Sequence, residues 1–282
     1  MKIKKIKSYA KINLSLNVLG KLKNKYHKIE SIFSLIQLYD KIFIKENKKN
    51  NHSIIFHGKF SKGIPKNNTV SKLLEILDKK KLLNKKKYSI KIVKKIPQKS
   101  GMAGGSMNAA SLLRFFLLKN KFKISKKDLQ NIARQIGSDV NIGLMRSPLV
   151  LYGDKTLIEL NKKFSFHILI IKPNFGCSTR AIYKKVRKFS KSAFKKNKRI
   201  VLNNSIISEF KNDLEVPAFK MYPKLKKMKL FMSGLDKILF TRMTGSGSTI
   251  VGYFKSKKAA IYAQKILKKK YKNYWCILSK TI

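Results

Sequence analysis

The sequence is poor in acidic residues, in cysteine and in long apolar runs. Only 13 of its 282 residues are Asp or Glu, against 66 Lys and Arg, so the formal net charge at pH 7 is +53. The two cysteines, Cys177 and Cys276, show no CxxC or Cys/His ligand spacing, which argues against a zinc site and favours reduced thiols in a cytoplasmic protein. No segment approaches the roughly 20 apolar residues that cross a bilayer, and residues 1–9 lack the apolar core of a signal peptide. We therefore expect a cytoplasmic location and no membrane partner.

The positive charge by itself would favour nucleic-acid binding, because clustered cations release counterions from a phosphate backbone. The distribution argues otherwise: the lysines are scattered, and only seven of the basic residues are arginine, the side chain best suited to bidentate phosphate and base recognition. Two explanations stay open, an AT-rich genome that places lysine at solvated positions and a surface selected to bind polyanions. In either case the field attracts anionic nucleotides and opposes association of two copies.

The order of periodic segments predicts an α+β chain. Residues 11–19 alternate strictly between apolar and polar, so Lys11 and Asn13 should project from the same side of one strand. The other expected strands of the first half are 31–38, 41–46, 53–57 and 88–94. Helices are expected at 69–80, from Ser106 through Leu118, and from the Ser125 cap to Gly137.

Beyond about residue 160 strands and helices alternate, which predicts a second α+β domain. The expected strands are 166–172, 237–243, 250–254 and 274–279, and the expected helices are 178–188, 205–210, 213–232 and 256–270. Pro217 and Pro223 should start or break a helix within 213–232. We therefore divide the chain into domains 1–160 and 161–282.

A glycine-rich loop follows the strand at 88–94 and leads directly into a helix. Gly101, Ala103, Gly104 and Gly105 remove side chains where a triphosphate could approach, and the helix from Ser106 directs its positive N-terminus there. Phosphoryl transfer depends mainly on such positioning. The loop is neither G-x-x-x-x-G-K-[ST] nor G-x-G-x-x-G, so an ordinary strand-to-helix turn is the alternative.

In the wider sequence the loop resembles the central ATP-binding motif of the GHMP kinase superfamily, in the form P-x-x-x-G-[LM]-[AG]-G-G-S-x-N-A-A of the 4-diphosphocytidyl-2-C-methyl-D-erythritol kinases. Further blocks occur in the order of that family. They are Tyr9-Ala10-Lys11-Ile12-Asn13-Leu14, Tyr26-His27, Ile136-Gly137-Ser138-Asp139-Val140, Asn212-Asp213-Leu214-Glu215 and Met243-Thr244-Gly245-Ser246-Gly247-Ser248. Ordered blocks that cover most of the chain are far more specific than any one of them.

The resemblance implies a two-domain α+β GHMP kinase fold, with an N-terminal ribosomal-protein-S5-like domain and a C-terminal ferredoxin-like α/β domain. It implies that Asp139 is the general base for the acceptor hydroxyl, a role that suits a carboxylate within hydrogen-bond reach. Lys11 would stabilise that aspartate and the charge that develops on the transferred oxygens. A turn residue after a helix-capping glycine is the plain alternative for Asp139, and a solvated strand lysine is the alternative for Lys11.

The resemblance also assigns the binding residues. The ATP contacts would be Asn68, Lys94, Pro97, Gln98, Lys99, Ser100, Gly101, Met102, Ala103, Gly104, Gly105, Ser106, Met107 and Asn108. Mg²⁺ would accompany ATP, with Ser106 as the one protein group proposed near it. The substrate contacts would be Asn13, Tyr26, His27, Gly153, Thr179, Tyr183 and Gly245.

Among the substrate contacts, Tyr26 and Tyr183 would stack on a cytosine ring while His27 hydrogen-bonds its polar edge, so that stacking gives affinity and the imidazole gives base selectivity. Taken singly, each aromatic residue is more often part of a core. The loop departs from the family where Met107 replaces a serine and Lys99 replaces a small or apolar residue. Asn141 replaces the proline after Asp139-Val140.

The implied reaction transfers the γ-phosphate of ATP to the 2-hydroxyl of 4-diphosphocytidyl-2-C-methyl-D-erythritol, in non-mevalonate isoprenoid precursor biosynthesis. The implied partner is this small cytidine diphosphate, with no specific nucleic acid, in a monomer or homodimer. Two alternatives stay open: a GHMP kinase for another alcohol, of the homoserine or mevalonate type, and a basic nucleic-acid-binding protein on a decayed kinase scaffold.

Overall fold

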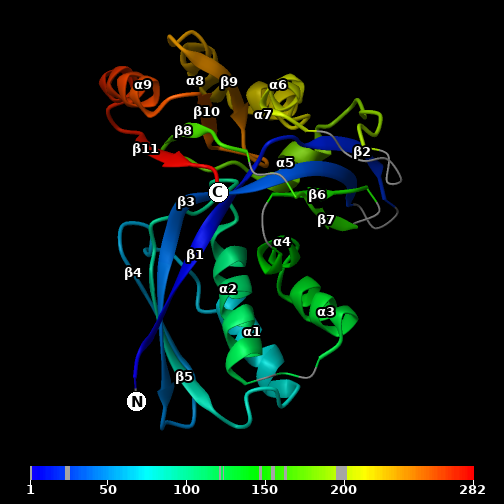
Figure 1. Ribbon diagram of the computed structural model, residues 1–282, viewed down its shortest axis with the longest axis vertical. Helices are drawn as coiled ribbons and strands as arrows, with labels where there is room; N and C mark the ends of the chain where they lie inside the picture. Colours follow the sequence, from blue (N-terminus) through cyan, green and yellow to red (C-terminus); the bar gives the residue numbers. More distant parts are fainter. Residues whose placement is uncertain are drawn as a thin grey trace. The chain divides into compact units, whose positions relative to one another are not determined.

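The computed structural model describes residues 2–22, 26–120, 122, 124–145, 148–153, 156–161, 164–194 and 202–282 (Figure 1). The backbone forms two compact units that interleave along the chain. The first unit contains residues 1–10, 38–98 and 103–146, and the second contains residues 11–37, 99–102 and 147–282. The sequence predicted two contiguous domains, 1–160 and 161–282, whereas each compact unit contains several separate segments of the chain. The boundary between the two domains stays a prediction.

A seven-stranded sheet contains the first seven described strands of the chain. Its order is β4-β5-β3-β6-β7, and β1 and β2 also pair with β3. The strands are β1 (Lys4–Asn13), β2 (Asn17–Lys21), β3 (His27–Asn47), β4 (Ser53–His57), β5 (Lys87–Val93), β6 (Leu149–Leu151) and β7 (Leu157–Glu159). The C-terminal half of β3 pairs with β5 in the first unit, and its N-terminal end pairs with β2 and β6 in the second.

Within the described part of the first unit, four helices lie to one side of strands β1, β3, β4 and β5 (Figure 1). The helices are α1 (Thr69–Lys79), α2 (Gly104–Lys119), α3 (Lys126–Ile136) and α4 (Val140–Leu144). Strand residues such as Ile42 and Ile90 share one buried cluster with helix residues such as Leu73 and Phe116. Burial of this alternating apolar face drives the packing of helix on sheet.

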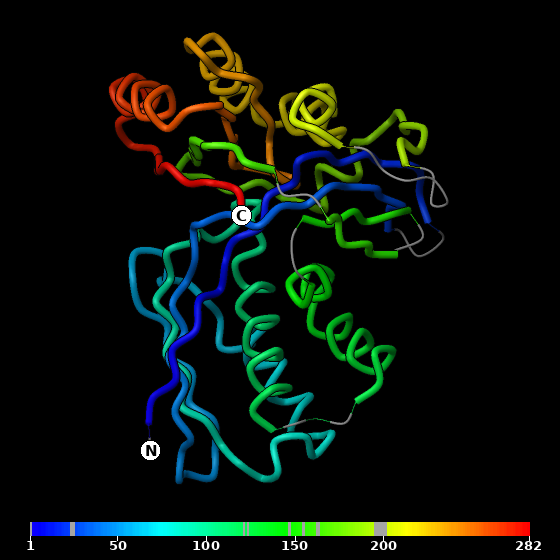
Figure 2. The backbone as a smooth tube through the Cα atoms, in the orientation of Figure 1, coloured from blue at the N-terminus to red at the C-terminus, as the bar shows by residue number. Residues whose placement is uncertain are grey.

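In the second unit a four-stranded antiparallel sheet has the order β11-β8-β10-β9. Its strands are β8 (His167–Lys172), β9 (Ile238–Met243), β10 (Ile250–Phe254) and β11 (Trp275–Lys280). In order of sequence this is 4-1-3-2, the arrangement of a ferredoxin-like βαββαβ domain. Figure 2 shows the C-terminal strand, in red, beside β8, in green, although the two lie far apart in the sequence.

The described residues of the second unit also form five helices: α5 (Thr179–Lys184), α6 (Asn204–Glu209), α7 (Glu215–Met221), α8 (Pro223–Ser233) and α9 (Lys257–Lys270). Residues of α8 and α9, such as Met228 and Leu267, share a buried cluster with Leu169 and Ile250 of the sheet. No helix of the described residues is long and apolar enough to cross a membrane.

Several expected elements are present with small differences in their bounds, and others differ for tertiary reasons. The strands expected at 31–38 and 41–46 are parts of the single strand β3, and the strand expected at 11–19 is divided between β1 and β2. The division follows from hydrogen bonding, because the N–H of Leu14 donates to Ile32 O and the N–H of Leu16 donates to Lys211 O. Helix α5 ends at Lys184 instead of residue 188, and α4, β6 and β7 were not expected.

Candidate active site

The glycine loop runs from the end of β5 to the start of α2 and has a strongly bent backbone. The angle φ is positive at Lys99 (48°), Gly101 (74°) and Ala103 (54°), in the left-handed region that glycine adopts freely and other residues rarely enter. A Cβ atom at position 101 would lie 2.1 Å from the carbonyl oxygen of Thr244. Glycine is therefore required at position 101 for both its backbone angle and its close contact.

The start of α2 leaves amide groups without a side-chain cap. Ala103 is the N-cap residue and makes no side-chain hydrogen bond to the helix. Gly104 and Gly105 follow it and carry no side chains. Uncapped N–H groups at a helix start have a partial positive charge that favours anions. This is the backbone that phosphate binding needs, and the contact with phosphate stays a prediction.

Asn68, expected near the nucleotide, is the N-cap residue of α1. Its Oδ1 atom accepts the N–H of Val70 at 2.9 Å, in a capping box with Ser71. The next residue, Thr69, donates its hydroxyl to Gly105 O at 2.8 Å. The start of α1 is thereby bonded to the first turn of α2, so Asn68 and Thr69 help to place the loop.

Lys94 and Asn108, also expected to contact ATP, have side chains that are 4% and 1% exposed. The Lys94 ammonium forms a buried ion pair with Asp40 and donates to Asn108 Oδ1 at 2.9 Å. Gln98 donates its amide to Phe60 O at 3.0 Å. These three side chains therefore fix the loop from inside the first unit.

The other loop residues divide by exposure. Pro97, Ser100 and Met102 are buried, and Lys99 is exposed. A Cβ atom added at Gly176 would lie 2.7 Å from the Cβ atom of Lys99, so the loop is packed tightly there. Because Lys99 is exposed, an anionic ligand could reach its side chain.

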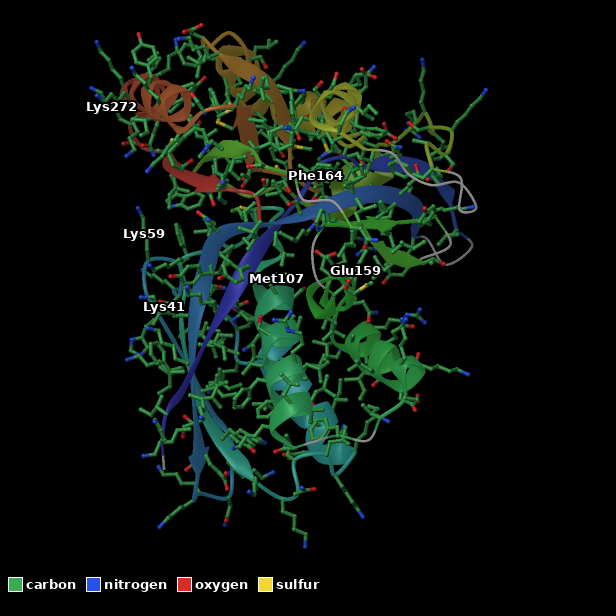
Figure 3. All side chains as sticks on the ribbon, viewed as in Figure 1. Lys41, Lys59, Met107, Glu159, Phe164 and Lys272 are labelled. Carbon is green, nitrogen blue, oxygen red and sulfur yellow. The ribbon has the colours of Figure 1, made fainter. Side chains whose placement is uncertain are left out.

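Ser106 lies in the first turn of α2 and is close to the segment that leads to Asp139. A Cβ atom added at Gly137 would lie 3.6 Å from Ser106 Oγ. Asp139 is the N-cap residue of α4, and its carboxylate does not cap that helix. Met107, near the start of α2 in Figure 3, is 2% exposed, and its sulfur would lie 3.1 Å from a Cβ atom at Gly143 of α4. Met107 thus packs α2 against the helix that begins at Asp139.

In the second unit the end of β1 carries a compact polar network. The Lys11 ammonium donates to Asn13 Oδ1 at 2.9 Å, and Asn13 Nδ2 donates to Ser31 Oγ at 2.9 Å. The Thr244 hydroxyl accepts the N–H of Asn13 at 3.1 Å and donates to Gly101 O at 3.3 Å. Asn13 is 2% exposed, and its amide oxygen orients the Lys11 ammonium through this hydrogen bond.

Two of the residues predicted to bind the cytosine ring, His27 and Tyr183, form a ring pair in the second unit. The rings of His27 and Tyr183 have centroids 5.0 Å apart and planes inclined by 37°. The Nε2 atom of His27 is buried and has no hydrogen-bond partner among the described residues. Burial, and then the nearby Lys21 charge, lower the pKa of His27 below 6.5, so the imidazole is neutral at pH 7. Tyr26 is 71% exposed and is not in the ring pair.

The remaining predicted substrate residues also lie in the second unit. The Thr179 hydroxyl, in the first turn of α5, is 2.7 Å from Ser246 Oγ. Gly245, next to that serine, has φ of 54°. A Cβ atom at Gly153 would lie 2.6 Å from the Lys28 side chain. The structure thus brings Thr179 to the turn after β9, and Gly153 to β3 beside the position of His27.

Among the described residues, no group of three or more His, Cys, Asp and Glu side chains could hold a metal ion. Mg²⁺ and its expected neighbour Ser106 stay predictions.

Three structural residues of the site were not assigned from the sequence: Asp40, Thr69 and Thr244. Each acts through a partner distant in the sequence, respectively Lys94, Gly105 and Asn13. For Asp40 the sequence offered one signal, an acidic residue between two apolar strand segments. In the structure Asp40 is 0% exposed. A buried carboxylate in a chain with so few acids indicates a specific partner.

Comparison with protein families gives two matches along the chain. Residues 68–154 match the model described as GHMP kinases N terminal domain. Residues 190–273 match the model described as GHMP kinases C terminal. The first match contains the glycine loop and Asp139, and the second contains the turn after β9.

Individual relatives match over nearly the whole chain. The 4-diphosphocytidyl-2-C-methyl-D-erythritol kinase of Pelagibacter ubique (strain HTCC1062) is 54% identical over 278 residues, covering 99% of each chain. A crystal structure of 4-(cytidine 5'-diphospho)-2C-methyl-D-erythritol kinase superposes with a TM-score of 0.78 at 22% identity, covering 99% of this chain and 100% of that one. A homoserine kinase structure from Cytophaga hutchinsonii gives 0.72 at 17% identity, covering 100% and 95%. The likeness to these two structures concerns the fold.

Proposed function

The chain belongs to the GHMP kinases, and among them to the 4-diphosphocytidyl-2-C-methyl-D-erythritol kinases, and on this premise we propose that it transfers the γ-phosphate of ATP to the 2-hydroxyl of 4-diphosphocytidyl-2-C-methyl-D-erythritol. It is thus an ATP-dependent small-molecule kinase in the synthesis of isoprenoid precursors by the non-mevalonate route. The nucleotide would bind at the loop from Pro97 to Asn108.

The observation that carries the choice of acceptor is the buried Nε2 atom of His27, which lies beside the ring of Tyr183 and has no hydrogen-bond partner within the described part of the chain. A buried polar atom without a partner is costly unless a ligand or water satisfies it. The edge of cytosine offers both an amino donor and ring acceptors, and a neutral imidazole nitrogen can pair with either kind, depending on its tautomer. Homoserine and mevalonate carry no base for this pair to hold.

Each predicted catalytic residue has a distinct task in the proposed reaction. The carboxylate of Asp139 takes the proton from the acceptor hydroxyl as its oxygen attacks the γ-phosphorus. The ammonium of Lys11, oriented by Asn13, stabilises the negative charge that develops on the attacking and transferred oxygens. The amides of the glycine loop hold the phosphates in line, which supplies most of the catalysis expected for phosphoryl transfer.

We also propose Mg²⁺ as the ion that accompanies ATP. The residues present suit an ion held mainly by phosphate and water, because Ser106 Oγ lies beside Gly137 of the segment leading to Asp139 and no larger group of metal ligands exists among the described residues. When bound, the ion would neutralise charge on the phosphates. A cytoplasmic location is part of the proposal and is supported by Cys177 and Cys276, which are both free thiols.

The test is an acceptor panel with the purified protein and Mg²⁺-ATP. We expect ADP release with 4-diphosphocytidyl-2-C-methyl-D-erythritol and none above background with homoserine or mevalonate. Cytidine monophosphate should compete with the acceptor, because it carries the same base for the ring pair to hold. Turnover of homoserine or mevalonate in preference to the cytidine compound would overturn the choice of acceptor.

A further inference from the structure

The first unit buries a carboxylate that the proposed reaction does not use. Asp40 lies in β3, is 0% exposed, and is surrounded by donors. Its Oδ1 atom accepts the backbone N–H groups of Lys95 at 2.6 Å and Ile96 at 2.9 Å. Its Oδ2 atom accepts the amide of Asn108 at 3.0 Å and pairs with the Lys94 ammonium.

These donors stand at the two ends of the glycine loop. Lys95 and Ile96 are the second and third residues after β5, which ends at Val93, and Asn108 is in the second turn of α2. Asn108 also accepts a hydrogen bond from Lys94 at 2.9 Å. One carboxylate therefore ties the start of the loop to its end.

The loop between these ends has a backbone that needs support. Lys99 and Ala103 both have positive φ, of 48° and 54°, and conformations of this kind persist only where the surroundings fix them. Ala103 also starts α2 without a side-chain cap. Loss of the bonds at the ends would let these residues relax and would change the directions of the loop amides.

We propose that Asp40 is a positioning residue for the nucleotide, which acts by fixing both ends of the loop 97–107 so that the loop amides meet the triphosphate of ATP. The proposal rests on the proposed function for the identity of the nucleotide. Because Asp40 is 0% exposed, it would act through the loop and not by contact with the nucleotide. Lys94 and Asn108 act together with Asp40, because their polar atoms are bonded to Asp40 and to each other.

The test compares two double variants, Asp40→Asn with Lys94→Met and Asp40→Ala with Lys94→Met. Both remove the ion pair as a whole, so neither leaves an unpaired buried charge. Only the asparagine variant keeps an oxygen for the N–H groups of Lys95 and Ile96. We expect the alanine variant to raise KM for ATP at least about tenfold over the asparagine variant. The KM for the acceptor alcohol should stay within about twofold in both.

Asp78→Asn is the matched control in the same unit, because it removes an ion pair with Lys87 that has no bond to the loop. It should lower the unfolding midpoint and leave KM for ATP unchanged. If the alanine and asparagine variants differ in unfolding midpoint but share one KM for ATP, Asp40 only stabilises the unit and the proposal is overturned. If the alanine variant does not fold, Asn108→Ala, which keeps the ion pair, should also raise KM for ATP, and an unchanged KM would overturn the proposal.

Hydrogen exchange separates this inference from the proposed function. The amides of Lys95 and Ile96 should exchange faster in the alanine variant than in the asparagine variant, with or without nucleotide. Equal exchange at these two amides would refute the positioning role even in an active enzyme. A wild-type protein that binds no ATP would refute the proposed function, whatever the exchange result.

Discussion

His27 is the residue on which base selectivity depends in the proposed reaction. Removing its imidazole by His27→Ala leaves the base edge without its partner, so we expect KM for the cytidine substrate to rise about 10- to 100-fold. The KM for ATP should not change. Steady-state kinetics with each substrate varied in turn measures both values, and His57→Ala, at an exposed position, is the matched control. Equal effects of the two variants would contradict the assignment.

The same residue gives a pH dependence with a defined sign. Burial holds the pKa of His27 below 6.5 in the folded protein, so on acidification the unfolded chain takes up the proton first. The stability that the neutral imidazole contributes is complete above pH 6.5 and is lost as the pH falls through the lowered pKa. We expect KM for the cytidine substrate to be constant above pH 6.5 and to rise below it in wild type, but not in His27→Ala. A rise of the same size in both proteins would exclude His27 as the cause.

Asp139 carries the proton transfer in the proposed mechanism. We expect Asp139→Asn to lower kcat about 100- to 10,000-fold, because the amide cannot accept the proton, while the dissociation constant for ATP stays nearly the same. Rapid-quench measurement of a single turnover separates this chemical step from product release. Asp128→Asn changes a carboxylate that accepts a hydrogen bond from the cap residue Ser125 and should keep kcat near wild type. A near wild-type rate for Asp139→Asn would refute its role as base.

Helix α6 is held to the segment after β1 by one buried guanidinium. Arg242, 4% exposed, donates to the carbonyls of Ile207, Ser208 and Phe210 at the end of α6, and to Leu14, next to Asn13. Burial lowers the pKa of Arg242, yet four carbonyl acceptors keep the charged form satisfied. The arginine fork suits such a set of acceptors, which a lysine cannot reproduce.

We therefore expect Arg242→Lys to lower the free energy of unfolding by about 2–4 kcal/mol, since several buried acceptors lose their donors. Urea unfolding followed by circular dichroism measures the change. Arg187→Lys, at an exposed position, should stay within about 0.5 kcal/mol of wild type. Equal stabilities of the two variants would show that the α6 contacts contribute little.

Periodicity predicted the elements whose pattern is local. Strands β4 and β10 begin and end at the expected residues, α3 begins after the expected cap Ser125, and α9 begins one residue after its expected start at Ser256. Helix α4 escaped prediction because it has only five residues and forms where Gly143 packs closely on α2. The motifs predicted that the glycine loop and Asp139 belong to the candidate site. They could not predict contacts such as those of Asp40 with the loop, because these contacts join residues far apart in the sequence. For Asn68 and Lys94, the sequence could not show that their polar atoms are bonded within the protein.

For the molecule as a whole, the net charge of +53 should raise the rate at which substrates associate with the protein and should have little effect on the rate of phosphoryl transfer. Both proposed substrates are anionic, so the field steers them toward the protein, and salt screens it over about 10 Å at 0.1 M. We expect kcat/KM for ATP to fall several-fold between about 50 and 500 mM potassium chloride, with kcat nearly constant. Stopped-flow binding at several salt concentrations checks the association rate. An association rate that does not depend on salt would mean that the charge is remote from the path of the nucleotide.

The identity and the position of the phosphorylated group test the central claim most directly. The protein is incubated with Mg²⁺-ATP and 4-diphosphocytidyl-2-C-methyl-D-erythritol, and the product is examined by two-dimensional ¹H–³¹P nuclear magnetic resonance. The account predicts one new phosphate monoester on the oxygen at carbon 2, formed in step with ADP and absent with Asp139→Asn. A phosphate on another hydroxyl, or ATP hydrolysis without phosphorylation of the acceptor, would contradict it.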